Sequence, residues 1–303
     1  MIKINDVSKC FGSLRALDGV STSVERGEAV ALLGPNGAGK STLIKCLLGV
    51  LDFTGEIIVD GLGVRDNSKL TKALMGYVPQ EPAFYDMTVL ELVGFFGSLR
   101  NVKKERIMEA IELTGLAEHA GKHCSALSGG MKQRLSFAIA MLSDAPILLL
   151  DEPTSNLDAF VRTDFLRLIR DFKENGKTIL FSSHRLDEVE FLADRVVVMN
   201  SGRVVLECSP HDLTKQIEHK TRIHLEIPSS SLPAADSVIR EFGYEAVTLN
   251  CGDLIVETSV ENKMGLLSAL IRRNVPVTDF KVEEISMEEL MLALVSERGN
   301  DGH

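Results

Sequence analysis

The sequence contains the glycine-rich stretch Gly34-Pro35-Asn36-Gly37-Ala38-Gly39-Lys40-Ser41-Thr42. The apolar run Ala29–Leu33 before it is typical of a buried strand, and Leu43–Leu48 after it has the character of a helix. In such a strand-loop-helix context, glycines allow backbone N–H groups to turn inward onto phosphates, and the helix N-terminus adds a favourable dipole. The sequence therefore predicts a loop that binds nucleotide phosphates.

Two side chains at the end of this loop have separate expected roles. Lys40 is expected to reach the β- and γ-phosphates of the nucleotide, and Ser41 is expected to bind Mg²⁺. An ordinary glycine turn between a strand and a helix is the alternative, but this spacing in this context is rare by chance. The predicted nucleotide-binding residues of the loop are Gly34, Asn36, Gly37, Gly39, Lys40, Ser41 and Thr42.

Two adjacent carboxylates follow a second apolar run, Ile147-Leu148-Leu149-Leu150-Asp151-Glu152. Ligands of parallel sheets bind at the carboxyl ends of the strands. We expect Asp151 to hold Mg²⁺ through water and Glu152 to orient the attacking water as a general base. An acidic strand end that only caps the next helix is the alternative, and the presence of a phosphate loop in the same chain argues against it.

Further apolar runs of strand length alternate with helical periodicity. The runs Thr178–Ser182 and Val196–Met199 are separated by helical segments at Phe165–Phe172 and Leu186–Ala193. Buried parallel strands joined by crossover helices give this alternation. Strands also dominate roughly the first 60 residues, and residues 84–145 form a helical insert. We therefore expect an α/β fold with a doubly wound parallel sheet.

The pattern changes after Pro210, where shorter strands and helices follow one another. The expected elements are a strand at Arg222–Ile227, a helix at Pro233–Phe242, a hairpin of Ala246–Asn250 and Leu254–Thr258 around Cys251-Gly252-Asp253, a helix at Lys263–Arg273, a strand at Thr278–Glu283 and a short amphipathic helix at Met287–Val295. The order β-α-β-β-α-β is typical of a ferredoxin-like α+β domain. We expect a nucleotide-binding domain at residues 1–215 and an accessory domain at residues 216–303.

Composition excludes several classes of protein. The 303 residues include 33 basic and 43 acidic side chains, a formal net charge of −10, and no dense cluster of Lys and Arg. Nucleic acid is therefore not an expected partner. The five cysteines are scattered without a Cys-x-x-Cys pair, which indicates reduced thiols. The sequence shows no secretory signal and no run of about 18 apolar residues, so we expect a cytoplasmic protein that reaches a membrane only through a partner.

A third motif lies between the phosphate loop and the acids, Leu127-Ser128-Gly129-Gly130-Met131-Lys132-Gln133-Arg134. With it, the chain resembles the ATP-binding cassette (ABC) ATPases over roughly residues 1–215. Ser128 and two glycines at a helix start form a second anion-binding nest, with a serine-capped helix start as the alternative. The resemblance implies a RecA-like sheet with an antiparallel β subdomain. It also implies that two copies close head to tail, so that Ser128, Gly129 and Gly130 of one complete the ATP site of the other.

The resemblance assigns roles to further positions. Phe11 would stack on adenine, Gln80 would contact Mg²⁺ and water, and His184 would contact the γ-phosphate. The loop Ser155-Asn156-Leu157-Asp158 would cross the dimer interface. Asn156 stands where glycine or alanine is commoner, and asparagine adopts a positive φ less readily than glycine. The expected catalytic residues are Lys40, Gln80, Glu152 and His184, and the expected metal ligands are Ser41, Gln80 and Asp151.

The same resemblance implies an ATPase subunit that uses ATP and Mg²⁺ and energises separate transmembrane permease subunits from the inner face of the cell membrane. Met131, where glutamine is usual, is similar to the export-type ABC-2 group. Two segments, Glu81-Pro82-Ala83-Phe84-Tyr85 and Ser183-His184-Arg185-Leu186, are similar to the cassette of nitrous oxide reductase maturation. Phe84, Tyr85 and Met87 suit a groove for a permease helix, with ordinary packing as the alternative.

Two other functions are compatible with parts of the sequence. One is an importer whose C-terminal domain senses the substrate, as in methionine importers, although Met131 argues against it. The other is a non-transport cassette in DNA repair or translation, but such proteins usually carry tandem cassettes, long coiled coils or basic surfaces. His119, His123 and Cys124 could suggest a metal site, but they fall in a loop-like stretch where their spacing has no helical meaning. The sequence does not indicate the cargo.

Overall fold

The computed structural model describes residues 1–218, 221–244, 246–248, 253–258 and 262–284. The chain divides into two compact units, Met1–Pro210 and His211–His303. The predicted turn at Cys251-Gly252 and the predicted helix at Met287–Val295 lie outside the described residues.

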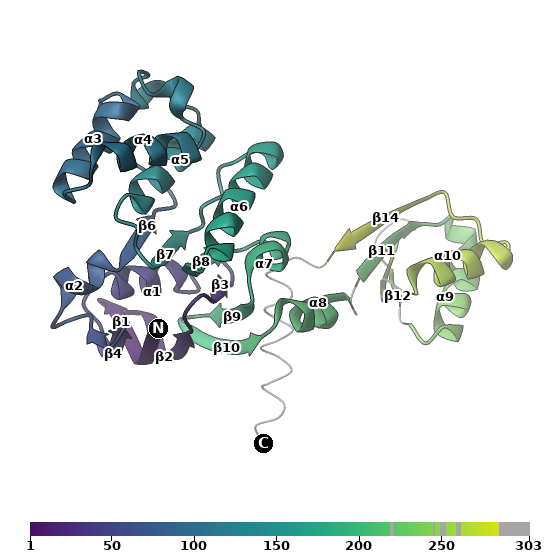
Figure 1. The fold of residues 1–303 in the computed structure, drawn as a ribbon. Coiled ribbons are helices and arrows are strands. Elements are labelled where there is room, and N and C mark those ends of the chain that lie inside the picture. The colour runs from purple at the N-terminus through teal and green to yellow at the C-terminus, as the bar shows by residue number, and fades with distance from the viewer. Residues whose placement is uncertain (219–220, 245, 249–252, 259–261, 285–303) are drawn as a thin grey trace. The chain divides into compact units, whose positions relative to one another are not determined.

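A six-stranded sheet forms the centre of the first unit (Figure 1). Its strands, in spatial order, are β10 (Arg203–Cys208), β9 (Arg195–Asn200), β3 (Ala29–Leu33), β8 (Thr178–Ser183), β7 (Ile147–Asp151) and β6 (Met75–Val78). All neighbouring pairs are parallel except β10 with β9, which is antiparallel. Strands β3, β7 and β8 are buried along their whole length, as continuous apolar runs in a parallel sheet predict. Their carboxyl ends meet at one edge.

Four helices connect and cover these strands. They are α1 (Lys40–Leu47), α5 (Gly129–Met141), α6 (Ala159–Glu174) and α7 (Leu186–Leu192). Edge-to-face ring contacts of Phe137 with Phe165 and Phe172, at centroid distances of 5.5 and 5.1 Å, fix α5 against α6. Helix α1 begins at Lys40, three residues before the predicted helix start at Leu43, so Lys40, Ser41 and Thr42 form its first turn.

An antiparallel sheet packs beside the central one. Its strands, in spatial order, are β2 (Leu14–Val24), β1 (Ile2–Phe11), β4 (Thr54–Val59) and β5 (Leu62–Gly63), followed by α2 (Ser68–Ala73). Ile4, Val7 and Leu17 share one hydrophobic core with Leu43 of α1 and Leu149 of β7. The sequence did not predict β2 as a separate strand, because Gly19 and irregular pairing with β1 interrupt its alternation.

The helical insert consists of α3 (Val89–Leu99), α4 (Lys104–Leu113), the short 3₁₀ turns η1 (Ala117–His119) and η2 (Cys124–Ala126), and the N-terminal part of α5. Thr88 and Glu91 form a capping box that starts α3. The insert helices lie together, away from the antiparallel sheet of β1, β2 and β4 (Figure 1).

The second unit contains a four-stranded antiparallel sheet with two helices. After α8 (Pro210–Glu218), the described elements are β11 (Thr221–Glu226), η3 (Ser229–Ser231), α9 (Leu232–Glu241), β12 (Ala246–Thr248), β13 (Asp253–Thr258), α10 (Lys263–Arg272) and β14 (Asp279–Glu284). The strands lie in the order β12-β13-β11-β14. Ile223 and Leu225 of the sheet pack with Ile239 of α9 and Leu266 and Leu270 of α10. This unit therefore has a hydrophobic core of its own.

Arg195, at the start of β9, joins the two sheets of the first unit. Its guanidinium donates to Glu28 at 2.8 Å, to Glu207 of β10 at 2.5 Å and to the carbonyl of Ser23 in β2. Burial opposes ionisation of Glu28, but hydrogen bonds from Arg195 and from the backbone of Glu25 outweigh it and hold the pKa of Glu28 below its ordinary value.

We therefore predict that Glu28→Gln lowers the free energy of unfolding at pH 7 by about 1 to 2 kcal/mol. The folded-state pKa of Glu28 is depressed, so the charge of Glu28 contributes fully to the free energy of unfolding above its unfolded-state pKa of about 4.3. This contribution is lost as the pH falls through the folded-state pKa. Urea denaturation at pH 7 and at steps below pH 4.3 measures this. The gap between wild type and variant should close in acid, whereas Glu109→Gln, at an exposed surface pair with Arg106, should change little. A gap independent of pH would contradict the assignment.

Candidate active site

The loop between β3 and α1 depends on glycine at two points of close approach. Gly39 is the N-cap of α1 and has a φ of 101°. A β-carbon there would lie 2.6 Å from the carbonyl oxygen of Ala16, and one at Gly34 would lie 2.2 Å from that of Met199. Only residues without a side chain fit these positions, and the backbone of Gly37 is also left-handed. The loop is therefore held in one shape by β2 and by the end of β9.

Lys40 directs its ammonium group back across this loop. Its Nζ donates hydrogen bonds to the carbonyl oxygens of Gly34, at 2.7 Å, and Pro35, at 3.1 Å. It also pairs with Glu152 Oε1 at 3.3 Å, and the Lys40 residue is only 4% exposed. Because a buried cation needs compensating oxygens, these contacts hold Lys40 in a defined position.

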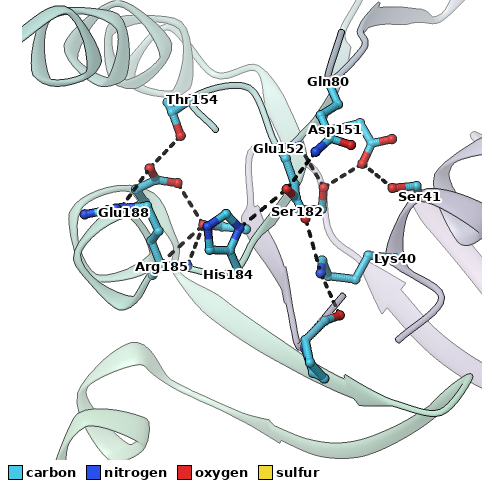
Figure 2. Close-up of polar contacts among 12 residues, drawn as sticks. Lys40, Ser41, Gln80, Asp151, Glu152, Thr154, Ser182, His184, Arg185 and Glu188 are labelled. Atoms are coloured by element: carbon cyan, nitrogen blue, oxygen red, sulfur yellow. Dashed lines mark hydrogen bonds and ion pairs between the residues drawn. The ribbon is translucent and has the colours of Figure 1, made fainter. Parts of the chain in front are cut away.

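Ser41 and Asp151 bring a hydroxyl and a carboxylate together from different elements. Ser41 Oγ and Ser182 Oγ each donate to Asp151 Oδ1 at 2.8 Å (Figure 2). Burial, and then the negative charge of Asp151, raise the pKa of Tyr77 to about 12. Hydroxyl and carboxylate oxygens in a locally negative site are the ligand chemistry that Mg²⁺ prefers, so these residues fit that ion.

Glu152 is the point where side chains from three strand ends meet. Gln80, just after β6, donates to Glu152 Oε2 at 3.1 Å, and His184 Nδ1, just after β8, lies 3.4 Å from the same oxygen. The Ser182 hydroxyl accepts a hydrogen bond from the Glu152 N–H at 2.8 Å. Glu152 is 7% exposed and has a φ of 42°, a left-handed conformation that its surroundings must maintain. The four predicted catalytic residues thus lie together, as Figure 2 shows.

A cavity of about 500 Å³ is lined by three members of this cluster, Lys40, Gln80 and Glu152. It is lined by Phe11, Leu14, Arg15, Ala16, residues 36–42, Gln80, Glu152 and Ser201. The predicted loop residues Asn36, Gly37, Gly39 and Thr42 therefore share one cavity with Phe11, whose exposed ring lies 5.2 Å from Lys9 Nζ. Its volume suits a nucleotide-sized ligand.

Sequence reasoning did not identify Leu14, Arg15, Ala16 and Ser201 as cavity residues. The first three enter because Phe11 pairs with Leu14 in the β1-β2 hairpin, which the sequence analysis did not predict. The signal was Gly12 directly after the apolar end of the first strand, a common turn pattern. Ser201 comes from the turn between β9 and β10, where it has a positive φ.

The structure does not bring Ser128, Gly129 and Gly130 into this cavity. Ser128 caps α5 by accepting a hydrogen bond from the Met131 N–H at 3.3 Å. A β-carbon at Gly130 would lie 2.5 Å from Val161 Cγ1, so this glycine allows α5 to start close to α6. The first turn of α5 is thus a separate place in the molecule from the phosphate loop.

The loop Ser155–Asp158 joins β7 to α6, and Asp158 caps α6 by accepting from the Val161 N–H at 3.0 Å. Asn156 is not among the described residues with positive φ, so asparagine is not strained where glycine or alanine is commoner.

His123 pairs with Asp86 at 3.2 Å, and no group of three or more potential metal ligands occurs among the described His, Cys, Asp and Glu residues.

The segment after Gln80 presents aromatic rings at the surface of the insert. Tyr85 is 69% exposed and packs edge-on against Phe95 of α3 at a centroid distance of 6.4 Å. Phe95 in turn contacts Phe96 at 5.5 Å. Phe84 and Met87 are only partly exposed.

No helix in the described part of the chain is long and apolar enough to cross a membrane.

Comparison with known proteins gives consistent matches. The family model described as ABC transporter matches residues 17–155, and one described as an AAA domain, putative AbiEii toxin, matches residues 124–189. The linearmycin resistance ATP-binding protein LnrL of Bacillus subtilis is 30% identical over 97% of this chain and 98% of its own length. The uncharacterized ABC transporter ATP-binding protein YxlF of the same organism is 35% identical over 97% and 99%. The Nod factor export ATP-binding protein I of Rhizobium etli is 36% identical over 71% of this chain and 70% of its own length.

Solved structures match about 70% of the chain. An ATP-binding subunit of an ABC transporter has a TM-score of 0.65 at 28% identity, over 71% of this chain and 92% of that one. A dimeric ATP-binding cassette in a post-hydrolysis state, bound to ADP and Pi, has a TM-score of 0.63 at 27% identity. The match covers 69% of this chain and 99% of that one.

Two glycine variants test the packing of the loop. Gly37→Ala should cost about 1 kcal/mol of stability, because the left-handed backbone disfavours a β-carbon but nothing lies within 4 Å. Gly39→Ala should cost about 1 to 3 kcal/mol more, because its β-carbon also meets Ala16. Thermal and urea denaturation of both variants measure the difference. Equal losses would show that the close approach of β2 does not constrain the loop.

Proposed function

This chain belongs to the family of ABC transporter ATP-binding proteins, and from that premise we propose how its residues carry out ATP binding and hydrolysis. It is the ATPase subunit of a transporter. The observation that supports the residue roles is the convergence of Lys40, Gln80 and His184 on the buried carboxylate of Glu152.

ATP binding is assigned to the cavity over the loop. Phe11 stacks on the adenine, the backbone N–H groups between Gly34 and Gly39 hold the phosphates, and Lys40 pairs with the β- and γ-phosphates. Asn36 and Thr42 line the same surface. Lys40 exchanges its present carbonyl partners for phosphate oxygens, which are stronger acceptors for an ammonium group.

Mg²⁺ is assigned to the oxygens of Ser41, Gln80 and Asp151, with Asp151 acting through water. When bound, the ion neutralises charge on the phosphates. The contact of Ser41 with Asp151 at 2.8 Å supports this set, because it brings the two oxygens together.

Hydrolysis is assigned to Glu152 as the general base. It accepts a proton from the water that attacks the γ-phosphate, and ADP and phosphate are the products. Gln80 and His184 orient the Glu152 carboxylate and contact the water and the γ-phosphate. Burial excludes bulk water from the carboxylate, so its orientation is set by these two neighbours and Lys40.

A second copy completes the site. Ser128, Gly129 and Gly130 form an anion-binding nest at the start of α5, yet they do not reach the cavity of their own chain. Dimeric cassettes among the similar structures support a head-to-tail pair in which this nest contacts the partner's nucleotide. A monomer would then bind ATP but hydrolyse it slowly.

A transmembrane partner and an export direction are proposed from the relatives and the insert. Relatives named for Nod factor export, linearmycin resistance and multidrug transport support an export-type role. The exposed rings of Tyr85 and Phe95 suit a permease helix, which would place the chain at the inner face of the membrane. An importer with a sensing C-terminal domain is the alternative, and a role in DNA repair or translation has less support. The cargo is set by the permease.

Residues 216–303, within the second unit, are proposed to form a ferredoxin-like accessory domain. Its described elements follow the order β-α-β-β-α-β, and β11 lies between β13 and β14 in the sheet. A core separate from that of the first unit supports independent folding.

Replacing the proposed base tests the mechanism. Glu152→Gln should bind ATP but lose about 10²- to 10⁴-fold in kcat, because the amide cannot accept the proton. Phosphate release and equilibrium binding of ATP measure the two properties separately. Hydrolysis near the wild-type rate would contradict the role of Glu152.

Mixing two inactive variants tests the shared site. Ser128→Arg and Glu152→Gln homodimers should each be inactive, whereas a mixed dimer regains one complete site, formed by Glu152 of the first variant and Ser128 of the second. Random pairing predicts recovery of about one quarter of wild-type activity. No recovery on mixing, with both variants folded and dimeric, would mean that the nest does not act across the interface.

A further inference from the structure

Glu188 in the first turn of α7 is a buried carboxylate without a role in the proposed mechanism. It is 2% exposed, and it accepts hydrogen bonds from Thr154 Oγ1 at 2.5 Å and Ser183 Oγ at 2.7 Å. Arg185 Nε lies 3.5 Å from its Oε1 atom. Figure 2 shows Glu188 between Thr154 on one side and Arg185 and His184 on the other.

The two hydroxyl donors belong to the two segments that shape the site. Thr154 stands two residues after Glu152 and directly before the loop Ser155–Asp158. Ser183 is the last residue of β8 and directly precedes His184. The Glu188 carboxylate therefore bridges the segment of the general base to the segment of the histidine that contacts it.

The neighbouring acid contacts the first turn of α6, which follows the same loop. Asp187 Oδ2 lies 3.3 Å from Arg162 Nη2 in the first turn of α6, and it also binds Arg185 at 3.2 Å. Burial opposes the charge on Asp187, but hydrogen bonds from Arg185 and the charges of Arg185 and Arg162 outweigh it and lower its pKa. The segments on both sides of the loop Ser155–Asp158 are thus attached to α7.

Packing alone does not require a charge at position 188. A buried carboxylate loses its hydration, and a well-packed apolar side chain of similar volume usually stabilises a fold as well or better. What a carboxylate offers instead is two acceptor oxygens that can receive both hydroxyls at once. This is a directional link between two loops, which an apolar residue cannot provide.

We propose that Glu188 is a positioning residue that couples the loop Ser155–Asp158 to His184. When the loop is held, Thr154 and Ser183 both bind Glu188, and His184 stays within 3.4 Å of Glu152. When the loop moves, the bridge opens and His184 loses its alignment. The inference rests on the proposed roles of Glu152 and His184.

The test is Glu188→Gln in the full-length protein, compared with Glu174→Gln at the exposed end of α6. The two hydroxyls bind different oxygens of Glu188, and in a glutamine one of these positions is an NH₂ group, which donates and cannot accept. The expected result is a fall in kcat of about 10- to 100-fold with ATP affinity unchanged, and no change for Glu174→Gln. The double variant Glu188→Gln with His184→Ala should be no slower than His184→Ala alone, because Glu188 acts through His184.

Independent losses that multiply in the double variant would overturn the proposal, as would a weaker ATP affinity at unchanged kcat. If Glu188→Gln fails to fold, Thr154→Val removes one donor of the bridge while keeping the volume, and the same non-additivity with His184→Ala is expected. If the proposed function itself is wrong, Glu152→Gln would retain hydrolysis, which distinguishes that case from failure of this inference. Loss of activity in Glu152→Gln together with additive effects at Glu188 would remove only this inference.

Discussion

The buried ion pair of Lys40 with Glu152 is the interaction on which the site depends. Lys40 follows β3 and Glu152 follows β7, and β8 lies between these strands in the sheet. The pair can form only because β8 ends in small side chains, with Ser182 in register with both Leu32 and Asp151. The strand order, the shape of the glycine loop and the left-handed backbone of Glu152 all serve to place two charges 3.3 Å apart out of solvent.

That pair also explains why so many polar groups accompany it. An ammonium and a carboxylate removed from water must satisfy their remaining hydrogen-bonding capacity within the protein. The carbonyls of Gly34 and Pro35 do so for Lys40, and Gln80 does so for Glu152, with His184 Nδ1 3.4 Å from the same carboxylate oxygen. The residues that orient the Glu152 carboxylate are therefore the same ones that compensate for its burial.

Local patterns predicted part of this arrangement and could not predict the rest. The glycine loop and the acidic strand end are contiguous in sequence, so Lys40, Ser41, Asp151 and Glu152 could be identified from spacing. Gln80 and His184 came only from resemblance, because a single polar residue after a strand has no distinctive pattern. Strand β2 and its contribution to the cavity were missed because Gly19 and pairing irregularities hide its alternation. In the second unit the element order was readable, but the order β12-β13-β11-β14 depends on tertiary pairing.

Glu188 shows most clearly what sequence reasoning cannot reach. Thr154 and Ser183 are far apart along the chain, and they meet one carboxylate only because β7 and β8 are neighbours in register. The same adjacency that brings Glu152 next to His184 therefore also brings their following loops within reach of α7. A fold that assembles a site from strand ends necessarily assembles the loops behind it as well. A carboxylate behind the site is thus well placed to make the alignment of His184 depend on the loop Ser155–Asp158.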